Sequence, residues 1–146
     1  MAQVMTMAST RKVKKLAVRK YKDLCYTYNE YIKIIDTTKE MLDKKLWFKG
    51  TARALPACME VLEQLSEYAL AVHLELQQAH DVLKVELKAI DEVRENGGII
   101  INPVDYIRVV EMRELVIYLK ELSKETISIL HELTGMIDQI NAIEKN

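Results

Sequence analysis

The chain has 146 residues, of which 49% are apolar and 29% are charged. These proportions suit one folded domain rather than a disordered chain. Its 4 glycines and 2 prolines are too few for the turns of an all-β sandwich, and its 2 cysteines exclude a disulfide framework. No apolar run approaches the roughly 20 residues that cross a bilayer, so no membrane span is predicted.

The first predicted helix extends from about residue 10 to about 47, because this segment lacks proline and glycine and is rich in helix formers. Apolar residues recur along it at heptad spacing: Tyr21, Tyr28, Ile35 and Leu42. The pattern Thr37-x-x-Glu40 resembles a capping box. A break near Thr37 is therefore the alternative, with a short helix over about 38–48.

Two further helices are predicted over about 56–95 and 103–144. Pro56 and Pro103 each fit the first position of a helix, where the missing N–H costs nothing. Asn96-Gly97 is a plausible C-terminal stop for the middle helix. Both segments carry apolar heptad rows, which are typical of helices packed side by side.

The predicted fold is all-α, an antiparallel bundle of three long helices, or of four if the first breaks near Thr37. Short connections make sequential helices antiparallel neighbours. The chain is expected to form a single helical-bundle domain over 1–146, with a basic N-terminal arm and helix start at 1–22.

Cysteine and histidine positions do not predict a metal site or a disulfide. In an antiparallel bundle Cys25 and Cys58 lie roughly 30 Å apart along the axis, too far for a bond that needs Cα atoms within about 7 Å. Free thiols favour an intracellular location. His73 and His80 are seven residues apart, rather than at the i, i+4 spacing of helical metal ligands.

Catalytic motifs are missing from the sequence. Gly97-Gly98 is not followed by the Gly-Lys-Ser/Thr of a phosphate-binding loop, and no Gly-x-Ser-x-Gly elbow is present. We therefore expect no catalytic residue, no metal and no cofactor, and a protein that is not an enzyme. A helical-bundle enzyme with a metal in its core is the less favoured alternative.

Charge is distributed unevenly along the chain. Residues 1–53 contain 13 basic and 5 acidic residues, whereas residues 54–146 contain 8 basic and 17 acidic residues. At about 100° per residue, five cations fall within one wedge of the first helix: Arg11, Lys12, Lys15, Arg19 and Lys22. Such a face fits phosphates or an acidic protein. It could also be solvated, contact acidic helices of this chain or of a second copy, or act in targeting.

Two other features are candidates for partner contacts. Trp47 could be an exposed anchor, because tryptophan is enriched at interface hot spots; its alternative role is closing the end of the bundle core. The acidic half, 54–146, is complementary in charge to a cationic channel that holds nucleic acid, and it could occupy such a channel. The alternative is that the acidic half is an ordinary solvated surface.

The small helical bundle rich in Ile, Lys, Glu and Tyr, with its basic first helix, resembles the helical-bundle proteins of a two-tailed virus of hyperthermophilic archaea. These include virion proteins and a related inhibitor of the host RNA polymerase. The resemblance covers the overall pattern and transfers no functional residue. It implies a non-enzymatic activity, in which the inhibitor binds inside the DNA channel of the polymerase and blocks promoter loading.

The sequence thus favours a non-enzymatic interaction protein that binds and modulates a macromolecular machine, with host RNA polymerase as the partner that the resemblance implies. The expected contacts are Arg11, Lys12, Lys15, Arg19, Lys22 and Trp47. The alternatives are a self-assembling structural protein, as in a virion, and a protein that binds nucleic acid through its phosphate backbone.

Overall fold

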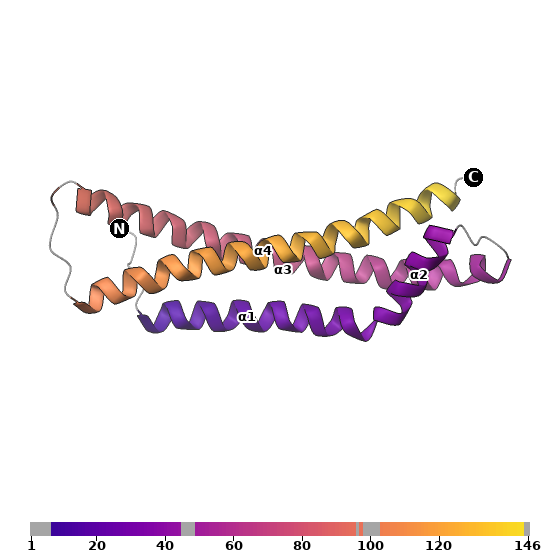
Figure 1. Cartoon of the computed structure of the whole chain (residues 1–146), viewed down its shortest axis with the longest axis horizontal. Coiled ribbons are helices and arrows are strands. Elements are labelled where there is room, and N and C mark those ends of the chain that lie inside the picture. The colour runs from indigo at the N-terminus through magenta and orange to yellow at the C-terminus, as the bar shows by residue number, and fades with distance from the viewer. Residues whose placement is uncertain (1–6, 45–48, 96, 98–102, 145–146) are drawn as a thin grey trace. The chain divides into compact units, whose positions relative to one another are not determined.

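The computed structural model describes residues 7–44, 49–95, 97 and 103–144. These residues form four α-helices and no strand (Figure 1). The helices are α1 (Met7–Glu30), α2 (Ile32–Lys44), α3 (Lys49–Glu95) and α4 (Pro103–Glu144). The all-α prediction is confirmed, with the four helices of the alternative rather than the preferred three. None of these helices is long and apolar enough to cross a membrane.

The chain breaks at Tyr31, between α1 and α2, and not near Thr37. The backbone N–H of Tyr31 donates to the carbonyl of Tyr28, three residues earlier, at 3.2 Å. Thr37 lies inside α2, so the predicted capping box is not used. The neighbouring Thr38 is fully buried, and its hydroxyl donates to the carbonyl of Ile34 at 2.7 Å. Because the Thr38 side chain is buried, the backbone stays helical here, where the Thr37-x-x-Glu40 pattern predicted the start of a new helix.

Helix α3 begins at Lys49, seven residues before the predicted start, and Pro56 lies inside it. Proline lacks the N–H that would bond to the carbonyl four residues earlier, so a helix bond is missing at this point. The prediction that Pro56 begins the helix was therefore wrong.

The other boundaries match the sequence predictions. Helix α3 ends at Glu95, and Gly97 follows with a φ of 78°, the left-handed conformation that favours glycine after a helix. Helix α4 begins at Pro103. It continues through Gly135, where the apolar row is not interrupted.

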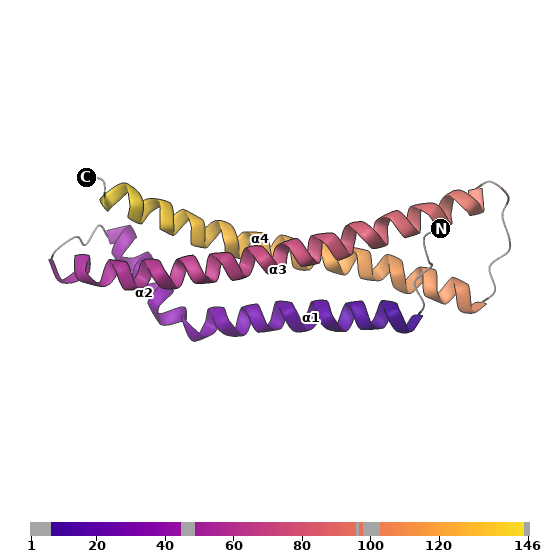
Figure 2. The same cartoon turned by 180° about the vertical axis from the view of Figure 1, so that it is seen from behind.

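The described helices belong to two compact units. The first unit comprises residues 1–20 and 73–124, and the second comprises residues 21–72 and 125–146. In both units, α3 runs antiparallel to α1 and α4 (Figures 1 and 2). The expectation of one domain over 1–146 stays a prediction, and each unit is described by itself below.

The core of the first unit comes from three helices. Helix α1 contributes Ala17, and α3 and α4 contribute longer apolar side chains. The buried residues of α3 and α4 recur at helical heptad spacing: Leu76, Leu83, Leu87, Val109, Met112, Leu115, Leu119 and Leu122. Most of this seam was predicted by the heptad rows. Val93, which the spacing also placed in a row, is exposed instead.

The core of the second unit includes α2 as well. Ile35 and Leu42 of α2 pack with apolar residues of α3 and α4. Those residues are Leu62, Leu65, Leu133, Met136 and Ile140. Cys25 and Cys58 both lie in this unit as free thiols, as predicted.

Candidate functional site

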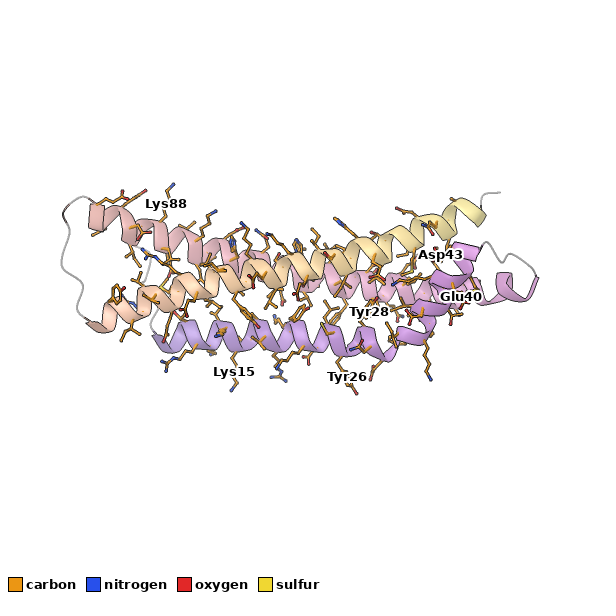
Figure 3. The ribbon with its side chains drawn as sticks, in the orientation of Figure 1. Lys15, Tyr26, Tyr28, Glu40, Asp43 and Lys88 are labelled. Atoms are coloured by element: carbon orange, nitrogen blue, oxygen red, sulfur yellow. The ribbon has the colours of Figure 1, made fainter. Side chains whose placement is uncertain are left out.

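Three cations form an exposed surface on α1 in the first unit. Lys12, Lys15 and Arg19 are all exposed and lie on the side of the helix opposite the buried Ala17. Figure 3 shows Lys15 pointing away from α3 and α4. We call Lys12, Lys15 and Arg19 the basic face. The amphipathic spacing that predicted a cationic wedge in the sequence is therefore confirmed for these three residues.

The neighbouring cations of α1 interact within the unit. Arg11 donates from Nη2 to Oε1 of Glu111 on α4 at 3.2 Å, and Lys20 pairs with Glu75 on α3. These exposed ion pairs contribute little to the free energy of folding, because water screens the charges. Arg11, a predicted site residue, thus has an intramolecular partner.

The charge of the basic face is not compensated in this way. Among the residues that the structure describes, no carboxylate forms an ion pair with Lys12, Lys15 or Arg19. The first unit as a whole has 13 basic and 10 acidic residues, a formal charge of +3, whereas the second has 8 and 12, a formal charge of −4. The basic face is therefore one exposed cationic surface of the net positive unit, and its three cations lie together on one side of α1.

The remaining two predicted contacts lie elsewhere. Lys22 is exposed and continues the spacing of the basic face along α1, but it belongs to the second unit. Trp47 lies outside the described residues, so its predicted role stays a prediction.

Two depressions flank α1 in the first unit. The one between α1 and α4 has a volume of about 350 Å³ and a mixed lining that includes Arg11, Lys14, Glu111 and Tyr118. Lys14 Nζ lies 5.7 Å from the centre of the Tyr118 ring, so this cation already has an aromatic partner. This depression was not expected from the sequence, because it depends on how two distant helices pair.

The depression between α1 and α3 has a volume of about 330 Å³ and a more apolar lining. Val13 of α1 and Ala79, Val82 and Leu83 of α3 contribute its apolar surface. Apolar pockets with a few polar groups are typical of binding sites. The groove also contains Lys20 and Glu75, which pair with each other, and the three residues of the basic face do not line it.

A polar contact between α3 and α4 in the first unit brings a histidine next to a serine. His73 Nδ1 lies 3.0 Å from the hydroxyl of Ser123 and 3.2 Å from the Ser123 carbonyl. Only the tautomer with the proton on Nδ1 donates to the Ser123 carbonyl, because the carbonyl only accepts hydrogen bonds. The hydroxyl instead donates to Oε1 of Gln77 at 3.2 Å. The buried Ser123 hydroxyl therefore has hydrogen-bond partners within the interface between α3 and α4.

Tyrosines and acids of the second unit are also paired with each other. The hydroxyl of Tyr28 donates to Glu132 at 3.2 Å, and Glu132 also pairs with Lys39. Burial and the hydrogen bond to Glu125 raise the pKa of Tyr21 above its ordinary value. Burial and the adjacent Glu132 charge raise the pKa of Tyr28 in the same direction. Tyr21 and Tyr28 are thus half-buried and hydrogen-bonded to acidic residues of their own unit.

An acidic row on α3 of the second unit is different. Glu60, Glu63 and Glu67 are exposed and follow i, i+3, i+7 spacing, which places them on one side of the helix. None of them forms an ion pair with a described residue. The charge count along the chain predicted an acidic half, whereas this row was not predicted, although the spacing of its three residues is visible in the sequence. We call these three residues the acidic row.

Metal binding has no support within the part of the chain that the structure describes, because no three His, Cys, Asp or Glu side chains gather there in a way that could hold an ion. Comparison with protein-family models, with curated proteins and with solved structures finds no match to this chain.

Proposed function

We propose that this protein is a non-enzymatic interaction protein that binds an acidic macromolecular surface through the basic face of α1. The observation that carries the proposal is the contrast between the cations of this helix. Arg11 and Lys20 pair with carboxylates of their own unit, whereas Lys12, Lys15 and Arg19 are exposed with no such partner.

The spacing of the basic face supports binding of an extended anionic surface. Lys12 and Arg19 are seven residues apart, which corresponds to about 10 Å along the helix axis. A straight row of cations on a rigid helix can contact several phosphates or carboxylates at once, without reading bases. The binding free energy then comes mainly from charge and depends strongly on salt.

A fluorescently labelled DNA duplex serves as the polyanion that tests this surface. We expect the full chain to bind it at low salt, with the logarithm of the affinity falling by about 2.7 per tenfold increase in salt if three phosphates are contacted. The triple variant Lys12→Glu, Lys15→Glu, Arg19→Glu is expected to lose binding, as measured by anisotropy.

The matched control reverses three exposed lysines elsewhere: Lys33→Glu, Lys120→Glu and Lys124→Glu. It changes the net charge by the same amount, so it separates a local surface from overall charge. Equal loss of binding in both variants, or no binding of the unaltered chain at low salt, would contradict the proposal.

The acidic row favours a second candidate function. Carboxylates spaced along a rigid helix can occupy a cationic channel that normally holds nucleic acid. The resemblance to bundle proteins of a two-tailed archaeal virus suggests the DNA channel of RNA polymerase as that channel. In this second proposal the acidic row of the second unit, rather than the basic face, contacts the partner.

Promoter-dependent transcription by an archaeal RNA polymerase tests the second candidate. If it holds, the full chain inhibits transcription, and the variant Glu60→Lys, Glu63→Lys, Glu67→Lys loses inhibition because its charge now repels the channel. The control is the triple variant Lys12→Glu, Lys15→Glu, Arg19→Glu, which is expected to retain inhibition. Absence of inhibition by the unaltered chain excludes this polymerase as the partner.

A further inference from the structure

The basic face of α1 and the acidic row of α3 have the same spacing. Both follow the pattern i, i+3, i+7, with Lys12, Lys15 and Arg19 in the basic face and Glu60, Glu63 and Glu67 in the acidic row. On an α-helix this pattern places three side chains within about 60° around the axis and along about 10 Å of its length. The two sets are therefore equal in length and in width, and they are opposite in charge.

Each set also brings like charges close together on its own helix. Lys12 and Lys15 are three residues apart, and Lys15 and Arg19 are four apart, which are the intervals at which helical side chains are neighbours. The acidic row repeats both intervals with carboxylates. Like charges at these intervals destabilise a helix. Among the residues that the structure describes, none forms an ion pair with either set, so nothing described there offsets the repulsion.

The charges of the two units are complementary in the same way. The first unit, which contains the basic face, has a formal charge of +3 (13 − 10), and the second, which contains the acidic row, has −4 (8 − 12). The whole chain has a formal charge of only −1, so net charge hardly opposes contact between two copies. Charge thus favours an approach in which the first unit of one copy meets the second unit of another.

We propose that the basic face binds the acidic row of a second copy of this chain, with α1 of one copy parallel to α3 of the other. In this direction the equal spacing sets each cation opposite one carboxylate: Lys12 opposite Glu60, Lys15 opposite Glu63, and Arg19 opposite Glu67. The inference rests on the proposed function, because it names the acidic surface that the basic face binds.

A second copy accounts for both charged surfaces, whereas a nucleic acid accounts for one. Phosphates would pair with the basic face and leave the acidic row without a counter-charge. Because the contact joins two different surfaces, every copy has one of each sign. Such contacts either close into a ring or continue as a chain, and the mass of the assembly distinguishes these two forms.

Sedimentation velocity of the full chain over a range of concentrations tests the contact. At low salt we expect larger species to form as the concentration rises, and high salt is expected to return the chain to a monomer by screening the charges. Two triple variants each make the facing charges alike: Lys12→Glu, Lys15→Glu, Arg19→Glu and Glu60→Lys, Glu63→Lys, Glu67→Lys. Each is expected to weaken self-association tenfold or more, because repulsion replaces attraction at every pair.

Mixing the two triple variants gives the sharpest result. The first variant has only acidic surfaces at these positions, and the second has only basic ones, so an equimolar mixture is expected to associate although neither variant does alone. A chain that carries all six reversals is likewise expected to associate with itself. Recovery in the mixture also shows that the separate losses do not come from misfolding.

Two controls match the change in net charge of each triple variant. They reverse exposed residues outside both sets: Lys33→Glu, Lys120→Glu and Lys124→Glu in one chain, and Glu92→Lys, Glu121→Lys and Asp138→Lys in the other. Both controls are expected to associate as the unaltered chain does. If they lose association to the same extent, overall charge drives it and the proposed contact is wrong.

The remaining outcomes separate this inference from the function on which it rests. If the unaltered chain stays monomeric at low salt but duplex DNA binds the basic face, the inference fails and the proposed function stands. If neither self-association nor DNA binding occurs, both fail. If the two triple variants lose association and their mixture does not recover it, the two surfaces do not face each other and the inference is overturned.

Discussion

Replacing Leu133 with alanine is expected to lower the free energy of unfolding by about 2–5 kcal/mol. Leu133 is fully buried in the second unit, in a cluster with Ile35 and Leu42 of α2 and Leu62 of α3. Truncation removes apolar contacts with residues of three helices and leaves a cavity among them. Urea unfolding followed by circular dichroism at 222 nm measures the loss.

The control for this substitution is Leu70→Ala on the exposed side of α3, where the side chain is 44% exposed. A surface change of this kind is expected to alter stability by only about 0.5 kcal/mol. Similar effects of Leu133→Ala and Leu70→Ala would contradict the arrangement of this core, because burial is the difference between the two sites.

Replacing Pro56 with alanine is expected to stabilise the protein by about 1–3 kcal/mol. Pro56 lies inside α3, where it lacks the N–H of a continuous helix. Its side chain is exposed, so removing the ring loses little packing. Alanine restores the missing helix bond and has the most favourable helix propensity. Chemical denaturation measures the difference in stability.

The second proline provides the control. Pro103 begins α4, where an N–H would have no partner within the helix, so Pro103→Ala is expected to change stability far less. If Pro56→Ala proved destabilising, or no different from Pro103→Ala, then Pro56 would behave as the first residue of its helix. That result would restore the boundary that the sequence predicted.

Local sequence rules determined the features that depend on neighbouring residues. Pro103 and Gly97 gave the start of α4 and the end of α3, since backbone conformation restricts both residue types at those positions. The heptad rows predicted the buried seams, and the cation spacing predicted the exposed basic face, because both follow from the 3.6-residue turn of the helix. The free state of Cys25 and Cys58 followed from the same geometry.

Only the tertiary structure decided the features that depend on distant residues. The break at Tyr31 has no proline or glycine to mark it, and the alternative at Thr37 failed because Thr38 is buried inside α2. Pairing across helices likewise decided which cations of α1 stay available: Glu111 contacts Arg11, whereas no described carboxylate pairs with Lys15. The exposure of Val85 is of the same kind, because an apolar residue is buried only where another helix covers it.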